Sequence, residues 1–455
     1  MTNASTDNKR ATLELGTEPV GRLLWRYALP AIIAMTAASL YNIIDRIFIG
    51  QRVGAEAIAG LAITFPFMNL TTAFGAAVGI GSATAISVKL GQKDYLSAQY
   101  ILGNTITLNL INGIGLSVIS LLFLDPILRF FGASDATLPY AREFMQIILL
   151  GNVISHMYFG MNALLRAAGK PRHAMYATIF TVGTNILLDV VFIIWWQWGI
   201  RGAACATVLS QLMALIWQFY LFSNKHELLH LRQGIYRLKS YLVKNIISIG
   251  VSPFLMNVCA CVVVIFVNNQ LVRYGGDMAV GAYGIANAVA TVFVMFCIGL
   301  NQGMQPIAGY NYGSQQTDRL LRVLRLSIIA ATGIMTTGWL VAMLMPHAVA
   351  RMFTTDVTLV SMSASAIRYV MLVFPVIGFQ MVVTNFFQCI GKVRVSIFLS
   401  LSRQLLILLP MLALLPTFFS LNGVWSAMPV SDFFASVIAF IIIGRYMHQL
   451  KCQPK

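Results

Sequence analysis

Long apolar runs recur along this chain, separated by short stretches of charged, glycine or proline residues. Each run has roughly 20 residues or more, enough to cross about 30 Å of hydrocarbon as a helix. A bilayer core contains no water, so such runs satisfy their backbone hydrogen bonds internally, as helices. We therefore predict twelve transmembrane helices, near residues 23–49, 57–84, 104–124, 141–165, 174–198, 202–223, 245–272, 281–307, 326–347, 367–390, 396–418 and 423–447.

The composition supports a lipid-solvated body. Of the 455 residues, 58% are hydrophobic and 10% are charged, whereas soluble globular chains have about 25% charged residues. The net charge of +16 could indicate a nucleic-acid partner, but that reading requires basic residues clustered on a soluble surface, and here they are scattered. We predict an all-α integral membrane protein whose partners include membrane lipid and exclude nucleic acid.

The 31 Lys and Arg residues divide unevenly between the two sides of this arrangement. Both termini and the even-numbered connections hold 23, and the other side holds eight. Because cytoplasmic loops are enriched in positive charge, this division predicts an even number of spans with both termini in the cytoplasm. The first apolar run lacks a cleavage site of small residues, so we expect a retained helix in the cell inner (cytoplasmic) membrane.

The two halves of the chain repeat each other at a nearly constant separation along the sequence. Six spans per copy is an even number, so the copies share one orientation and are related by an axis along the membrane normal. Parallel repeats of this kind place the substrate path between two bundles near the midplane. The matching segments include Pro30 with Pro253, "AGKPR" from Ala168 with "IGKVR" from Ile390, and "GIRGA" from Gly199 with "GVWSA" from Gly423.

This repeat predicts five segments. A cytoplasmic N-terminal segment (1–22) precedes an N-terminal lobe (23–223), and a cytoplasmic connection (224–244) leads to a C-terminal lobe (245–447) and a cytoplasmic tail (448–455).

Two of the fifteen acidic residues lie at membrane depth. Asp45 is near the outer end of the first span and Asp189 is within the fifth. A carboxylate at the bilayer centre costs about 2.5 to 3.5 kcal/mol, so it normally faces a cavity and has a function. For Asp45 an ion pair or interfacial cap beside Arg46 is the alternative. Asp432 lies several residues into the twelfth run, and spans seven and eleven contain no acid.

Polar side chains accompany these two acids. Asn185 is one turn before Asp189, and Thr207 lies about as deep in span six as Asp189 does in span five. Tyr41 shares the helix face of Asp45. Carboxylate, carboxamide and hydroxyl oxygens suit a proton relay or Na⁺, so we predict a coupling-ion pocket in the N-terminal lobe.

Other residues are candidates for binding and bending. Polar or soft side chains that could contact a substrate in the N-terminal lobe are Asn152, Met157, Asn162 and Thr178. Pro30 removes a backbone donor from the first span and is a candidate hinge.

Two motifs could indicate an enzyme instead. "HELLH" from His226 to His230 matches the zinc-binding HExxH pattern, but it lies in the basic interlobe connection, and no third ligand follows. "AGKPR" lacks the upstream Gly and the following Ser or Thr of a phosphate-binding loop. Six scattered cysteines form no metal pattern. We expect no enzymatic activity, no cofactor and no structural metal.

The segments "PAIIAMTAASLYNIIDRIFIG", "LAITFPF", "LLRAAGKPR", "NILLDVVFI" and "GIRGAACATVLSQ", in this order and spacing, resemble the multidrug and toxic compound extrusion (MATE) family. The resemblance extends over essentially the whole chain and is strongest to the DinF/MepA-like branch. It implies a V-shaped fold of two lobes and export of amphipathic organic cations in antiport with H⁺ or Na⁺. We expect the protein to be a monomer that works by alternating access.

The same resemblance places the coupling-ion positions on Asp45, Asn185, Asp189 and Thr207, with Tyr41 nearby. Two alternatives stay open. The first is a flippase for a lipid-linked precursor, which would need a cavity rich in Arg and Lys. The second is an integral-membrane metalloprotease built on His226 and His230.

Overall fold

The computed structural model describes residues 14–52 and 55–452. Within these ranges, the structure leaves undescribed the side chains of residues 42, 43, 45–47, 50–52, 55, 56, 58, 59, 451 and 452. The described chain is almost entirely helical and contains no β-strand, which confirms the predicted all-α membrane fold.

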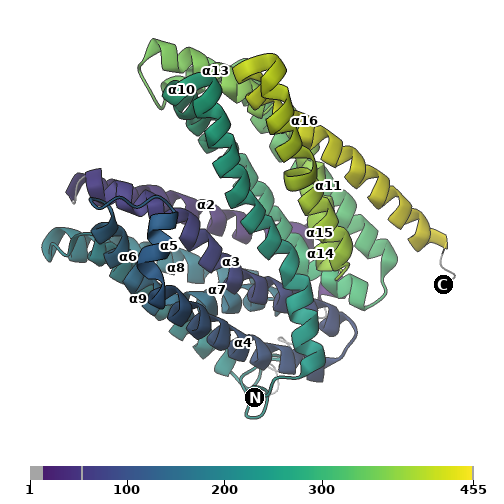
Figure 1. The fold of residues 1–455 in the computed structure, drawn as a ribbon. Helices are drawn as coiled ribbons and strands as arrows, with labels where there is room; N and C mark the ends of the chain where they lie inside the picture. Colours follow the sequence, from purple (N-terminus) through teal and green to yellow (C-terminus); the bar gives the residue numbers. More distant parts are fainter. Residues whose placement is uncertain (1–13, 53–54, 453–455) are drawn as a thin grey trace.

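The helices form two bundles that are joined at one end and spread apart at the other (Figure 1). The N-terminal lobe contains α2 (Val20–Arg52), α3 (Ala55–Gly91), α4 (Tyr95–Leu122), α5 (Leu124–Phe130), α6 (Leu138–Leu150), α7 (Asn152–Ala167), α8 (Pro171–Asp189), the π-helical segment η1 (Val190–Trp195) and α9 (Gly199–Ser223).

The C-terminal lobe contains α10 (Ser240–Gly313), α11 (Thr317–Leu344), α12 (Pro346–Arg351), α13 (Val357–Val370), α14 (Phe374–Cys389), α15 (Val393–Leu401), the π-helical segment η2 (Ser402–Leu408) and α16 (Leu409–Cys452).

The described helices accommodate the predicted number of crossings. Eight are long and apolar enough to span a membrane, or ten if the bent pairs α6 with α7 and α13 with α14 are each one span. Ser240–Gly313 and Val393–Leu450 have 74 and 58 residues, more than twice the roughly 20 that one crossing needs. Each contains a non-helical residue, Gly276 or Ser420. With these two runs crossing twice, the total is the predicted twelve.

Four predicted spans differ in detail from smooth helices. The fourth span bends by 56° between α6 and α7, and the tenth by 49° between α13 and α14. The fifth and eleventh each contain a π-helical segment, η1 or η2. An extra residue per turn interrupts the regular ladder of hydrogen bonds, and such segments are frequent at functional sites.

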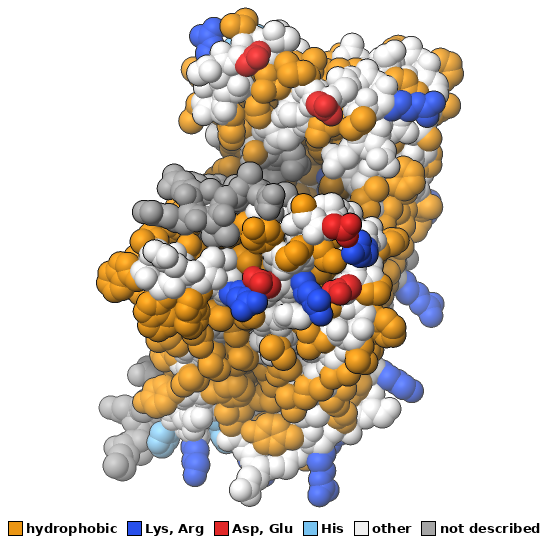
Figure 2. Space-filling view, turned by 60° about the vertical axis from the view of Figure 1, so that its left-hand side comes forward, with side chains coloured by type: hydrophobic (Ala, Val, Ile, Leu, Met, Phe, Trp, Pro, Cys, Tyr) orange, Lys and Arg blue, Asp and Glu red, His pale blue; other side chains and the backbone are white. Residues whose placement is uncertain are grey.

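The lobes meet at what we call the closed end, which contains the α3–α4 turn, the α10–α11 turn and the interlobe connection. The larger apolar core runs across both lobes there and includes Ile86 and Leu90 of α3 with Ile246 and Ile307 of α10. A smaller core, including Phe67, lies wholly in the N-terminal lobe. At the other end, the open end, the lobes diverge (Figures 1 and 2).

Glycines allow backbones of the two lobes to approach closely at the closed end. A Cβ added to Gly81 would lie 2.2 Å from the carbonyl oxygen of Ile246, and one added to Gly250 would lie 2.2 Å from that of Ala77. Real Cβ atoms do not approach this near. The helices α3 and α10 therefore pack in a way that excludes any side chain at these positions.

The interlobe connection is fastened to α4. α10 begins at Ser240, so the irregular segment covers residues 224–239. The carboxamide of buried Asn104 donates to the carbonyls of Ile235 and Arg237 at 3.3 and 3.0 Å, and accepts from Lys239 N at 2.9 Å. Because these bonds hold backbone groups, the connection lies against the N-terminal lobe up to the first residue of α10.

Candidate functional site

Asp189 is the last residue of α8 and directly precedes η1. Its side chain is fully buried. The segment after it, Val190–Trp195, is π-helical, and Trp196 N donates to Val191 O, five residues back, at 2.9 Å. The carboxylate thus lies where the helix changes its winding, within an apolar span, Pro171–Trp195.

Asn185 connects Asp189 to α9. With its carboxamide oriented to satisfy both neighbours, its nitrogen donates to Asp189 Oδ2 at 3.0 Å and its oxygen accepts from Thr207 N at 3.2 Å. Asn185 is 1% exposed and Thr207 is 9% exposed. The Thr207 hydroxyl donates to Ala203 O at 3.0 Å, which leaves its oxygen lone pairs available to a ligand. The structure therefore brings Asn185, Asp189 and Thr207 together.

The first span borders this cluster. α2 packs along α8 and also contacts α9 and η1. Tyr41 lies on α2 and is partly buried. Asp45 lies on the same helix, but its side chain is outside the described part of the structure. The predicted coupling-ion residues thus come from three helices that are mutually in contact.

The four predicted substrate-contacting residues do not form one group. Asn162 Nδ2 donates to Thr178 Oγ1 at 3.2 Å, across the α7–α8 interface. Asn152 lies ten residues from Asn162 on α7, about 15 Å along the helix. Met157 is buried in the apolar core shared by the two lobes. All four side chains are at least nine-tenths buried.

Pro30 lies inside α2, which remains helical on both sides of it. The proline lacks an N–H, so the hydrogen-bond ladder of α2 is weakest about one turn before this position. Bending of α2 near Pro30 therefore costs less free energy than bending elsewhere in the helix, which is compatible with the predicted hinge.

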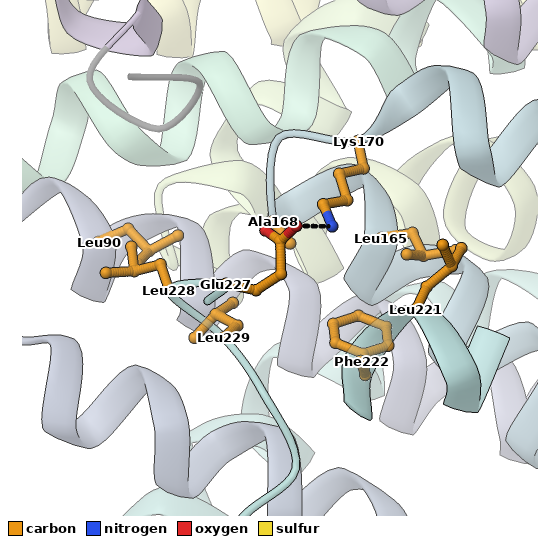
Figure 3. A pocket seen from close by; sticks show the side chains of 9 residues that line it. All are labelled: Leu90, Leu165, Ala168, Lys170, Leu221, Phe222, Glu227, Leu228 and Leu229. Carbon is orange, nitrogen blue, oxygen red and sulfur yellow. Dashed lines mark ion pairs between the residues drawn. The ribbon is translucent and has the colours of Figure 1, made fainter. Parts of the chain in front are cut away.

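The two enzyme-like motifs of the sequence contact each other. Lys170 Nζ of "AGKPR" lies 2.7 Å from Glu227 Oε1 of "HELLH", and both side chains line a small pocket with Leu90 and Phe222 (Figure 3). The segment 226–230 is not helical, so its histidines do not lie one turn apart on a helix as HExxH requires. No group of three His, Cys, Asp or Glu among the described residues could hold a metal.

Two arginines were not singled out by the sequence. Arg166 lies near the end of α7, where its guanidinium donates to Asn162 Oδ1 and lies close to Tyr158. Arg403 lies inside the eleventh span, in agreement with the predicted range 396–418. It pairs with Asp432 of α16, with 2.6 Å between Nε and Oδ1. The charge count gave no sign of this pairing because the partners are far apart in the sequence and lie on different helices.

The MatE family model matches the chain twice, over residues 30–191 and 249–414. The chain belongs to the MatE family. The two matched segments lie in corresponding parts of the two halves of the chain, which agrees with the predicted repeat and confirms the resemblance found in the sequence.

Similar proteins of known name include multidrug exporters. This MatE chain is 28% identical to "Multidrug export protein MepA" of Staphylococcus haemolyticus, over 92% of this chain and 93% of that protein. The corresponding protein of Staphylococcus aureus strain MRSA252 is 24% identical over 93% and 94%. A solved structure described as the outward-facing conformation of a multidrug resistance MATE family transporter has a TM-score of 0.91 at 24% identity, covering 97% and 98%. It shows the shared fold.

Proposed function

We propose that this MatE-family protein is a multidrug efflux transporter that exports amphipathic organic cations in antiport with H⁺ or Na⁺. The observation that supports this most is the buried carboxylate of Asp189, held by Asn185 beside Thr207 within a membrane-spanning helix. A carboxylate buried at membrane depth is costly and rare, and it commonly marks an ion or proton pathway. The MepA relatives are named as multidrug exporters.

The ligand set allows either coupling ion. A carboxylate oxygen of Asp189, a carbonyl oxygen of Asn185 and a hydroxyl oxygen of Thr207 are hard donors of the type that Na⁺ accepts, and the carboxylate alone can take a proton. Each elementary charge that crosses 100 mV supplies about 2.3 kcal/mol. An exchange that carries one net positive charge inward, such as two coupling ions for one monovalent cationic substrate, therefore suffices to concentrate the substrate tens-fold in the other direction.

The charge distribution supports a cytoplasmic position for the closed end. Basic residues of the closed end include Lys93, Lys225, Lys239 and Lys392, and a row of Lys and Arg without neighbouring acids follows this edge in Figure 2. Ion pairs occur at both ends, as in Lys89–Asp94 and Lys170–Glu227 at the closed end and Arg129–Asp135 and Arg201–Glu143 at the open end. At the closed end, however, Lys and Arg outnumber Asp and Glu. Excess positive charge is typical of the cytoplasmic side, which supports an outward-open conformation with both termini in the cytoplasm.

Transport then follows from rocking the two lobes about the closed end. In the inward-open state, an amphipathic cation enters between the lobes. After the change to the outward-open state, H⁺ or Na⁺ reaches Asp189 and Asp45 from outside and neutralises carboxylate charge in the N-terminal lobe. Loss of that negative charge weakens binding of a cationic substrate, and bending of α2 near Pro30 transmits the change.

Transport by the purified protein in liposomes tests this function. Movement of a fluorescent cationic dye across the liposome membrane is measured in two experiments. One imposes an inward H⁺ gradient and the other an inward Na⁺ gradient. We expect one gradient to be sufficient for dye movement and the other to have little effect, which names the coupling ion. A rate of dye movement that is independent of both gradients would contradict the proposal. Absence of movement for every cationic dye would also contradict it and would favour a lipid substrate.

A further inference from the structure

A column of polar side chains continues from the Asp189 cluster toward the closed end of the N-terminal lobe. Four polar residues of α8 follow one another at spacings of three or four residues: Thr178, Thr181, Asn185 and Asp189. Residues at these spacings share one face of a helix. From Asp189 to Thr178 a helix rises about 16 Å, more than half of a hydrocarbon layer about 30 Å thick.

Hydrogen bonds join this face of α8 to α7. Asn162 Nδ2 donates to Thr178 Oγ1 at 3.2 Å, and the Tyr158 hydroxyl is hydrogen-bonded to Thr178 and Thr181. The side chains of Tyr158, Asn162 and Thr178 are all more than nine-tenths buried. The column is thus enclosed between two helices and offers hydroxyl and carboxamide oxygens, groups that relay protons or bind small cations.

Arg166 lies at the closed-end terminus of this column. Its Nη1 donates to Asn162 Oδ1, one turn earlier on α7, and its Nε is buried without a hydrogen-bond partner. Within the described ranges, no carboxylate lies close enough to balance its charge. Lys170, four residues later, already contacts the interlobe connection at Glu227. Because a guanidinium stays protonated in proteins, this end of the column has a fixed positive charge.

The C-terminal lobe shows what this place in the fold requires. The separation between "AGKPR" and "IGKVR" places Gln388 at the position equivalent to Arg166, and Met411 at the position equivalent to Asp189. Gln388 is buried in the last turn of α14, just as Arg166 lies in the last turn of α7. A neutral side chain therefore fits this position, and the positive charge occurs in the lobe whose equivalent helix has the carboxylate.

An antiporter must keep its ion site from opening to both sides of the membrane at once. A path that joined Asp189 to the cytoplasm through the interior of the lobe would let the coupling ion enter without any substrate leaving. The polar column between α7 and α8 follows such a route. A fixed positive charge in a narrow polar path excludes cations and protons.

We propose that Arg166 is an electrostatic barrier that closes the cytoplasmic end of a cation path leading inward from Asp189. H⁺ or Na⁺ bound near Asp189 then reaches the cytoplasm only when the lobes rock to the inward-open state. This inference rests on the proposed function of the Asp189 cluster as the coupling-ion site.

Ion leak in the absence of substrate tests the barrier. An inward H⁺ or Na⁺ gradient is imposed on liposomes that contain the full-length protein and no dye substrate, and an internal pH or Na⁺ indicator reports entry. We expect the coupling ion to enter about tenfold faster in Arg166→Gln, since a unit charge about 10 Å away opposes a cation by roughly that factor at an effective dielectric constant of about 20. Arg166→Lys should stay as tight as the wild type. So should Arg322→Gln, which removes an exposed base of α11.

The other end of the path gives the decisive comparison. The double variant Arg166→Gln/Asp189→Asn should leak no faster than the wild type, because the ion no longer enters the column at Asp189. A folded Arg166→Gln that is as tight as the wild type would overturn the inference. So would a leak that is unchanged in the double variant, because the ion would then cross by another route.

Arg166→His covers the case in which Arg166→Gln does not fold. Imidazole loses its charge between about pH 5 and 8, so the leak relative to the wild type at the same pH should rise with pH. A leak ratio that does not rise, or failure of both variants to fold, contradicts the inference.

The same liposomes separate the barrier from the proposed antiport. Gradient-driven dye movement in the wild type without a leak in Arg166→Gln counts against the barrier alone. A leak in Arg166→Gln without gradient-driven dye movement in the wild type counts against the antiport alone.

Discussion

Gly91 and Gly313 occupy equivalent positions in the two halves of the chain, and each faces a backbone carbonyl of the opposite lobe. A Cβ on Gly91 would lie 2.0 Å from Tyr310 O, and a Cβ on Gly313 would lie 2.1 Å from Val88 O. Val88 lies three residues before Gly91, and Tyr310 lies three residues before Gly313, so the two contacts are copies of one contact related by the repeat. The closed end is therefore sealed by the same backbone approach used twice.

Alanine at either glycine is expected to open this end. Overpacking of a tight contact costs about 1 to 3 kcal/mol, which shifts a two-state population by about 5- to 150-fold. Spin labels at Gln92 and Gln316, one on each lobe, should report a longer distance in Gly91→Ala and Gly313→Ala.

Gly115→Ala and Gly333→Ala are the matched controls, because a Cβ at either position would meet nothing within 4 Å. Both should keep the wild-type distance. If Gly91→Ala and Gly313→Ala also keep it, the closed end is not held by these contacts.

Asn104 should control the order of the interlobe connection. Its replacement by Ala leaves the carbonyls of Ile235 and Arg237 and the N–H of Lys239 without their partner. Loss of hydrogen bonds to buried groups costs about 1 to 3 kcal/mol. Hydrogen exchange of residues 235–239 should accelerate in this variant. Asn257→Ala is the control, because Asn257 Nδ2 bonds its own helix at Pro253 O, and equal exchange in both variants would contradict the account.

Asp94 should stabilise the start of α4 in a pH-dependent way. Burial raises the pKa of this carboxyl, but hydrogen bonds from Ser97 and the charge of Lys89 outweigh it and hold the pKa below the ordinary value of 3.8. A lowered folded-state pKa means that the stabilisation is present above the unfolded-state pKa and is lost as the pH falls through the folded-state value.

Asp94→Ala is thus expected to cost about 1 kcal/mol of stability at neutral pH, the usual value of a helix N-cap. The cost should shrink on acidification below about pH 4. Thermal unfolding at several pH values measures both. The repeat provides the control: Gln316 occupies the equivalent position at the start of α11 but makes no capping bond from its side chain. A cost in Gln316→Ala equal to that in Asp94→Ala would contradict the assignment.

Hydropathy, charge asymmetry and repeat spacing predicted the helices and their number, and the resemblance of particular segments indicated the family. They could not predict the bends at Gly151 and between α13 and α14, because a straight helix and a bent helix show the same apolar sequence pattern. They also missed the ion pair between Arg403 and Asp432, since a contact between two helices leaves no periodic signal along either one. The grouping of Asn185, Asp189 and Thr207 was predictable because turn spacing and depth both follow from the helical rise.

The proposed function requires that Asp189 couples ion entry to export. Dye efflux, measured as dye uptake into energised inverted vesicles, should be compared between wild type, Asp189→Asn, Asp45→Asn and Asp318→Asn. Asp318 is an exposed acid in the first turn of α11, so its replacement controls for loss of one negative charge. We expect gradient-driven efflux to disappear in Asp189→Asn and Asp45→Asn and to persist in Asp318→Asn. Efflux at the wild-type rate in Asp189→Asn under the same gradient would contradict the account.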